Sequence, residues 1–127
     1  MNKYEKYNQK IFIDNIENLT KSNDNYRKVI YTTPNNNFQL VLMSLKPNEE
    51  IGLEVHNDIN QFFRVEFGSG IVQYNNVKKE IKNGDVVIIP AGTYHNIINN
   101  GKTELKLYTI YNPANHPRDK IEKNKLY

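Results

Sequence analysis

Histidine, carboxylate and amide side chains must carry any metal chemistry of this chain, because none of its 127 residues is cysteine. The same absence excludes disulfides and thiolate nucleophiles. Glu54 and His56 are separated by one residue. Side chains alternate across a β-strand, so a strand here would direct both onto the same face.

The segment that begins at Gln61 shows a similar alternation over a longer run. With Gln61 directed inward, strand parity predicts the other positions: Phe63, Val65 and Phe67 inside, and Phe62, Arg64 and Glu66 outside. One polar group followed by three apolar groups indicates a barrel with a polar site near one end.

A third segment surrounds a histidine with turn residues at fixed spacing. Residues 84–99 read GDVVIIPAGTYHNIIN, with glycine, proline, glycine, histidine and asparagine at 84, 90, 92, 95 and 99. This pattern resembles the second motif of the cupin superfamily without a departure. It predicts that Pro90 and Gly92 turn the chain and that His95 begins the next strand with its imidazole directed into the barrel.

The first cupin motif is matched with substitutions. The best frame places Asn48 at the family's leading glycine, Glu54 at its first histidine, His56 at its second, Gln61 at its glutamate and Gly68 at its final glycine. A rival frame that pairs His56 with Asp58 leaves only two residues before Gln61 and fits less well.

The resemblance implies a metal site formed by Glu54, His56, Gln61 and His95, with Zn, Fe, Mn, Ni or Co as the ion. It also makes Glu54 the candidate catalytic residue. A neutral amide oxygen is a weaker donor than a carboxylate, so Gln61 should weaken the site relative to a complete cupin. Alternatively, Gln61 hydrogen-bonds Glu54 or a substrate hydroxyl.

The elements that would position these residues are short strands separated by turns. We expect them at residues 26–33, 38–45, 51–56, 61–67, 71–74, 77–81, 85–89, 95–98 and 104–111. Asp14 and Glu17 resemble a capping box and predict a short helix over 14–20. The fold class is therefore all-β, and the resemblance specifies the cupin double-stranded β-helix, or jelly-roll barrel. We expect one domain over 1–127, with its core at about 26–112 and an irregular surface tail at 113–127.

Residues 38–45 are apolar at both strand parities, so both faces of this strand should be covered. This pattern favours a homodimer over a monomer. His116 is predicted to be an ordinary surface histidine in the tail. Tyr94, Tyr108 and Tyr111 are predicted to be packing residues, although Tyr108 could face the pocket from the last strand.

The net charge of +3 does not indicate a nucleic-acid partner. Residues 1–10 and 118–127 each carry +2, whereas residues 11–117 hold ten basic side chains against eleven acidic ones. A basic surface that could bind nucleic acid is therefore not expected on the domain. The sequence has no apolar stretch of membrane-spanning length and no signal-peptide pattern, so we expect a cytoplasmic protein without a membrane partner.

Three functions fit these residues. Residues 26–117 resemble small single-domain cupins of type 2 in the mannose-6-phosphate isomerase-like group. This implies a metal-dependent isomerase of a sugar or sugar phosphate, in which Glu54 or a metal-bound water moves a proton. However, no Lys or Arg cluster lies beside the motifs to bind phosphate. The alternatives are a mononuclear Fe(II) dioxygenase that uses Glu54, His56 and His95, and a non-catalytic barrel that binds a small molecule.

Overall fold

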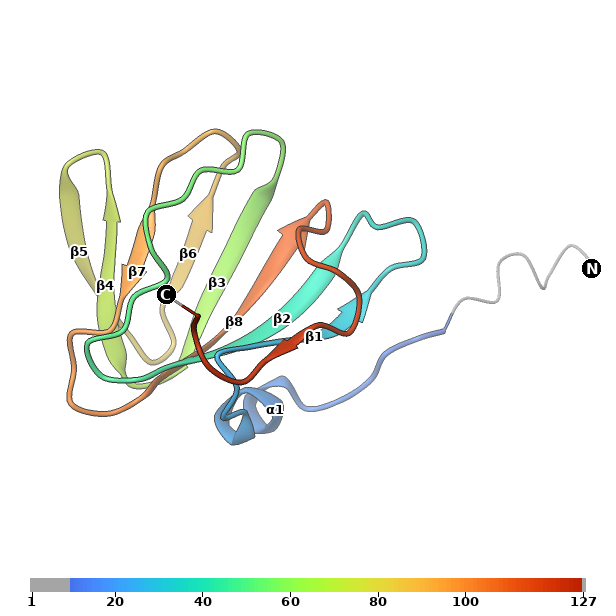
Figure 1. The fold of residues 1–127 in the computed structure, drawn as a ribbon, viewed down its shortest axis with the longest axis horizontal. Helices are drawn as coiled ribbons and strands as arrows, with labels where there is room; N and C mark the ends of the chain where they lie inside the picture. Colours follow the sequence, from blue (N-terminus) through green and yellow to red (C-terminus); the bar gives the residue numbers. More distant parts are fainter. Residues whose placement is uncertain (1–9, 127) are drawn as a thin grey trace, which may run out of the picture.

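The computed structural model describes residues 10–126, which form one helix and nine strands (Figure 1). In chain order these are α1 (Ile16–Ser22), β1 (Arg27–Thr32), β2 (Gln39–Leu45), β3 (Asn60–Phe67), β4 (Ser69–Tyr74), β5 (Val77–Lys82), β6 (Val86–Ile89), β7 (Asn96–Ile98), β8 (Leu105–Asn112) and β9 (Ile121–Glu122).

The strands form two antiparallel sheets, which confirms the predicted all-β jelly-roll class. One sheet has six strands in the order β6-β3-β8-β2-β1-β9, and the other has three in the order β5-β4-β7. Their inner faces share one apolar core. It includes Val41, Met43, Phe63, Val65, Leu107 and Tyr111 from the larger sheet and Val72, Ile81 and Ile97 from the smaller one.

The predicted parity of β3 holds over its first half. Gln61, Phe63 and Val65 are almost completely buried, in register with Tyr111, Thr109 and Leu107 of β8. A β-bulge then lies between Val65 and Phe67, so Phe67 pairs with Lys106 and is 43% exposed. The prediction that Phe67 points inward is therefore wrong, because the bulge inserts one extra residue and reverses the parity.

The orientation predicted for Glu66, the extra residue of the bulge, is also wrong. It was expected to face outward, but it is 5% exposed and pairs with Arg64 Nε at 2.6 Å.

The strand expected at residues 51–56 does not form as a continuous strand. Instead, the segment around residues 50–54 forms two isolated β-bridges with the chain near β7, Glu50 with Ile98 and Glu54 with His95. Between them Gly52 adopts a positive φ of 106° and Leu53 is 70% exposed. The chain is therefore not extended between the two bridges, although it runs along β7 at the edge of the smaller sheet.

The helix begins later than the sequence predicted. Asn15, not Asp14, is the N-cap, and its side chain accepts a hydrogen bond from the Asn18 backbone N–H at 2.8 Å. At seven residues, α1 is too short to cross a membrane, and no other helix occurs in residues 10–126. It packs on β2, β3 and β8.

Both faces of β2 are buried, as its apolar pattern predicted, and α1 supplies part of the outer cover. Because α1 of the same chain covers part of the outer face of β2, that face gives less reason to expect a dimer. The homodimer stays a prediction.

The C-terminal tail is more ordered than predicted. Ile121 and Glu122 form β9, which pairs with Lys28 and Arg27 of β1. The Arg27 guanidinium also donates a hydrogen bond to the Glu122 carboxylate. The residues after 112 therefore close one edge of the larger sheet instead of lying irregularly on the surface.

Asparagine occupies several left-handed turn positions. Asn75 and Asn76 have φ of 45° and 63° and turn the β4–β5 hairpin, as a type I′ turn requires. Asn48, at the position where the cupin motif has glycine, has φ of 68°. Asparagine tolerates this conformation better than other residues with a Cβ, which explains the substitution.

Gly68 and Gly84 allow a direct test of the packing between β3 and β8. Both have positive φ, 86° and 90°, so alanine at either should cost about 1–2 kcal/mol through the backbone alone. A Cβ at Gly68 would also overlap the Glu104 carbonyl oxygen, whereas nothing lies within 4 Å at Gly84. We expect Gly68→Ala to lower the free energy of urea unfolding by about 2 kcal/mol more than Gly84→Ala. Equal losses would contradict this packing.

Candidate functional site

Three of the four predicted ligands converge inside the barrel. Glu54, His56 and His95 each offer one ligand atom, and these atoms all lie within 4.8 Å of one another. Glu54 Oε1 lies 3.6 Å from His56 Nε2 and 3.9 Å from His95 Nε2. This spacing can place all three atoms around a single cation.

Backbone hydrogen bonds hold these residues together. The Glu54 N–H donates to the His95 carbonyl and the His95 N–H donates to the Glu54 carbonyl, both at 2.9 Å. The Gly92 N–H donates to the His56 carbonyl at 2.8 Å, which fixes the second histidine against the turn between β6 and β7. The two cupin motifs are thereby joined at the residues that carry the ligands.

The protonation of His95 leaves one ring nitrogen free to bind a metal. Its Nδ1 lies 2.9 Å from the Thr93 carbonyl oxygen. A carbonyl can only accept, so Nδ1 is the donor of this bond and Nε2 is the ring nitrogen available to a metal. The His95 side chain is only 1% exposed.

The Nε2 atoms of His56 and His95 are both buried and lack a hydrogen-bond partner among the described residues. An unpaired buried polar atom typically costs about 1–3 kcal/mol, and a cation between these nitrogens and Glu54 would remove that cost. The residues present therefore fit a divalent transition metal.

Gln61 lies on the same inner face but has a separate partner. It is 2% exposed, and its Nε2 donates to Thr109 Oγ1 at 3.1 Å. Its Oε1 is buried without a partner among the described residues. The bond to Thr109 directs the amide so that the acceptor oxygen remains free, as a weak fourth ligand requires. Ligation by Gln61 stays a prediction. Asp58, from the rival motif frame, is exposed and lies outside the three-residue cluster.

The tyrosines differ in their relation to the site. Tyr108 stacks on Phe62, with ring centroids 6.1 Å apart on the outer face, so the suggestion that it faces the pocket is wrong. Tyr94 is 59% exposed. Tyr111 is fully inside, packs edge-on against His56 at 6.1 Å, and has its pKa raised by burial. Tyr111 is therefore the tyrosine that borders the ligands.

His116 is not the ordinary surface histidine that the sequence predicted. Its ring packs edge-on against Tyr111 with centroids 5.2 Å apart, and its Nε2 lies 3.3 Å from the Tyr111 hydroxyl. Gln39 holds this part of the tail. Its Nε2 donates to the His116 carbonyl at 2.7 Å, and its Oε1 accepts from the backbone N–H groups of His116 and Asn115. The signal that could have revealed this contact is Gln39 itself, a polar residue opening an apolar strand.

The comparison with known families agrees with the motifs. The model of the cupin domain (Cupin_2) matches residues 41–111, which include all four predicted ligands. This chain belongs to the cupin family. The mannose-6-phosphate isomerase-like group within cupins stays a prediction.

Two curated relatives match most of this chain. The uncharacterized protein YrkC of Bacillus subtilis (strain 168) is 42% identical over 125 residues, which are 94% of this chain and 66% of YrkC. The uncharacterized protein L612 of Acanthamoeba polyphaga mimivirus is 45% identical over 116 residues, which are 88% of this chain and 71% of L612. This chain thus spans about two thirds of each relative.

A solved structure supports the same fold. BH2720 from Bacillus halodurans is 38% identical, superposes with a TM-score of 0.87, and covers 92% of each chain. This agreement supports the jelly-roll fold of the chain.

The metal content of histidine variants tests the cluster. We expect His56→Ala and His95→Ala each to weaken binding of Mn, Co, Ni or Zn by more than about 100-fold, because each removes a ligand and not merely a supporting group. His116→Gln, the matched change at the third histidine, should retain the metal. Metal analysis of the purified proteins measures this. Unchanged content in both alanine variants would remove the proposed ligand set.

The titration of His116 provides a separate test. Burial, with Arg27 and Lys120 nearby, lowers the pKa of His116 from 6.5 to about 4. The folded state therefore disfavours the charged ring, so this contribution to stability is complete above pH 6.5 and falls as the pH drops toward 4. We expect NMR of the ring protons to show this low pKa, and His116→Gln to flatten the pH dependence of unfolding over that range. A pKa near 6.5 would show that the ring is solvated.

Proposed function

We propose that this cupin binds a divalent transition metal through Glu54, His56 and His95, with Gln61 as a weak fourth ligand, and isomerises a small hydroxycarbonyl compound such as a sugar. One observation carries the metal site: two buried imidazole Nε2 atoms without partners lie within 4 Å of the same Glu54 oxygen. A divalent metal bound there supplies Lewis-acid polarisation of a carbonyl group.

Glu54 is the residue best placed to move a proton. Its side chain is 28% exposed, compared with 15% for His56 and 1% for His95, so it is the member of the cluster most open to a substrate. We assign it the removal of a proton from the hydroxyl-bearing carbon and its return to the neighbouring carbonyl carbon. The hydroxyl proton moves to the former carbonyl oxygen, so the isomerisation is balanced without a redox partner.

We propose an uncharged sugar rather than a sugar phosphate as the substrate. Among the described ion pairs, Glu54 is matched only with the two histidines. The Arg27 guanidinium, whose charge contributes to lowering the pKa of His116, is already engaged by Glu122. Among the described ion pairs, the metal site therefore offers no free cationic side chain that could bind a phosphate group.

The donor set also favours a second candidate, an Fe(II) dioxygenase. Two histidines and one carboxylate are the ligands of the facial triad that non-haem iron oxygenases use. Because the Gln61 amide is neutral, it would leave the charge of such a triad unchanged. The specific observation in favour is the composition of the cluster, Glu54, His56 and His95.

Activity of metal-loaded protein separates these functions. We expect aldose-to-ketose conversion with incorporation of deuterium from heavy water, and a loss of about 10²–10⁴-fold in kcat for Glu54→Gln. Glu80→Gln, a carboxylate change on an exposed part of β5, is the control and should keep full activity.

Oxygen uptake with Fe(II) and no isomerisation would favour the dioxygenase instead. A fully loaded site with neither reaction across candidate sugars would support a non-catalytic binding barrel and contradict the enzyme.

A further inference from the structure

We infer that the cleft between the β4–β5 hairpin and β6 is a second binding site, which accepts a small amphipathic carboxylate. The cleft has a volume of about 480 Å³, inside the range of roughly 300–1,000 Å³ that small-molecule sites occupy. None of Glu54, His56, Gln61 and His95 lines it. The site is therefore distinct from the metal centre.

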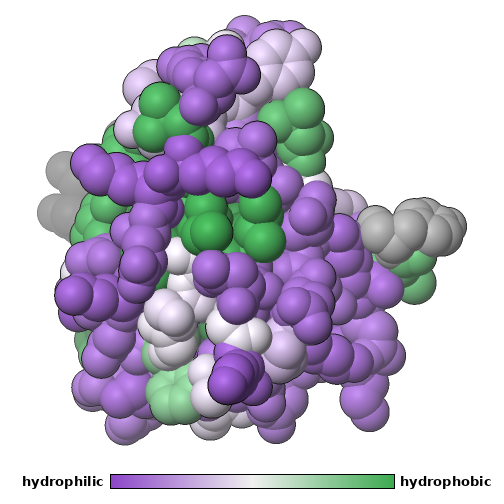
Figure 2. All heavy atoms as spheres, turned by 90° about the vertical axis from the view of Figure 1, so that its left-hand side faces the viewer, coloured by the Kyte–Doolittle hydropathy of each residue, from purple (hydrophilic) through white to green (hydrophobic). Residues whose placement is uncertain are grey.

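The cleft exists because the two sheets separate at this edge. β5 and β6 are each the terminal strand of their own sheet, and no strand pairing joins them in the described residues. On the side of the molecule that carries β4 and β5, hydrophobic surface is visible between hydrophilic side chains (Figure 2).

Aliphatic side chains from both sheets form the walls. Val72 and Ile81 come from the smaller sheet, and Val87 and Ile89 come from β6. Val72, Ile81 and Ile89 are only 3–5% exposed and belong to the apolar core, so the inner wall of the cleft is continuous with that core. Such walls suit an alkyl chain or a single ring, whose transfer from water they would favour.

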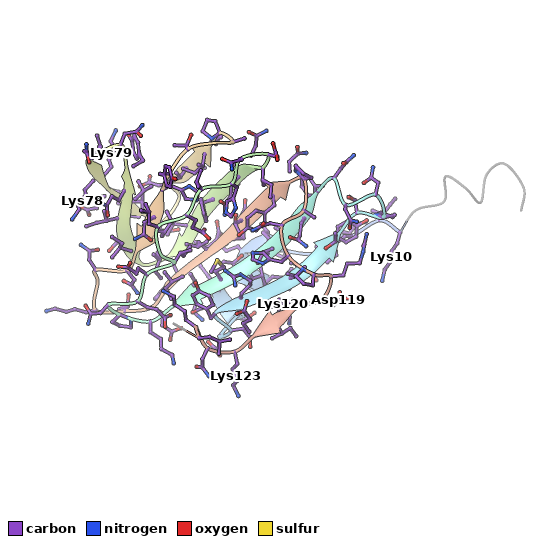
Figure 3. The ribbon with its side chains drawn as sticks, turned by 45° about the horizontal axis from the view of Figure 1, so that its top comes forward. Lys10, Lys78, Lys79, Asp119, Lys120 and Lys123 are labelled. Atoms are coloured by element: carbon purple, nitrogen blue, oxygen red, sulfur yellow. The ribbon has the colours of Figure 1, made fainter. Side chains whose placement is uncertain are left out.

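One lysine is placed on this apolar inner face. The register pairs Lys79 with Val72 and Ile81 with Gly70, so Lys79 and Ile81 share a face of β5. Lys79 lines the cleft, whereas its neighbour Lys78 does not. Both lysines lie on the hairpin at the far end of the molecule from Lys10 (Figure 3).

Lys79 makes no ion pair with any residue in 10–126. A cation at the rim of an aliphatic cleft is complementary to a ligand that joins an apolar body to one negative charge. Alternatively, Lys79 only prevents the edge strand β5 from pairing with another chain. The experiment below separates this role from ligand binding.

Part of the cleft lining lies next to the metal centre. Thr93 lines the cleft, and its carbonyl oxygen accepts the Nδ1–H of His95. Ile89 is paired in register with Gln61. The volume of about 480 Å³ limits the size of the occupant, which favours a medium-chain carboxylate over a long-chain lipid.

Titration of the metal-free, ¹⁵N-labelled full chain with octanoate tests this inference. We expect amide shifts concentrated in β4, β5 and β6, and affinity about threefold to fivefold weaker in Lys79→Gln, as for loss of an exposed ion pair. Lys78→Gln, on the same strand but outside the cleft, should bind like the parent protein. 1-Octanol, which has the same chain length without the charge, should bind parent and Lys79→Gln equally.

Three results would overturn the site. They are no saturable shift in β4–β6 at millimolar octanoate, equal weakening by the two lysine variants, and octanoate affinity unchanged in Lys79→Gln. Val87→Phe narrows the cleft and should abolish binding while the remaining amide spectrum stays parent-like. If that variant does not fold, the lysine pair and the octanol comparison still decide. Because the measurement uses metal-free protein, its failure is independent of the metal-content test.

Discussion

The candidate site depends on one pair of backbone hydrogen bonds, those exchanged between Glu54 and His95. They connect a loop from the first half of the chain to the edge of the smaller sheet. Two further bonds extend the connection, from Asn48 N–H to the Asn99 carbonyl and from Ile51 N–H to the Ile97 carbonyl. Because these contacts use only main-chain atoms, they are indifferent to the side chains. The first cupin motif can therefore change its ligand residues while the loop remains in place.

The polar groups of the barrel interior near this connection either have a hydrogen-bond partner or lack one. Thr93 satisfies one nitrogen of His95, Thr109 satisfies the amide nitrogen of Gln61, and Gln39 satisfies the backbone of the tail beside Tyr111. On the inner face, the atoms left without partners among the described residues are His56 Nε2, His95 Nε2 and Gln61 Oε1, which can all bind a cation. The other buried atoms without a hydrogen-bond partner, Arg27 Nε, Arg64 Nε and Glu66 Oε1, belong to side chains that form ion pairs. Native interiors rarely leave polar atoms unpaired. The cluster at the metal site is therefore the place where unpartnered buried atoms gather without an ion pair to a cationic side chain.

Local patterns predicted those parts of the molecule that local geometry controls. Strand alternation correctly placed Gln61, Phe63 and Val65, and the glycine, proline and histidine spacing of the second motif correctly located His95. The failures arise where distant contacts decide. The bulge at Glu66 depends on the register with β8, and the position of His116 depends on bonds to Gln39. Neither leaves a trace in the neighbouring residues. Glu54 and His56 converge although the expected strand is absent, because two bridges replace the missing strand pairing.

The left-handed asparagines have a consequence at the level of the gene. Asparagine makes up 21 of the 127 residues, and Asn36, Asn48, Asn75 and Asn76 stand at positive φ, where glycine would be the usual choice. Asparagine codons begin with two adenines, whereas glycine codons begin with two guanines. A genome under pressure toward adenine and thymine can exchange one for the other at such turns with little loss of fold. It cannot do so at Gly68, where a Cβ would meet the Glu104 carbonyl. The asparagine positions thus require only a left-handed backbone, whereas Gly68 also requires the absence of a side chain.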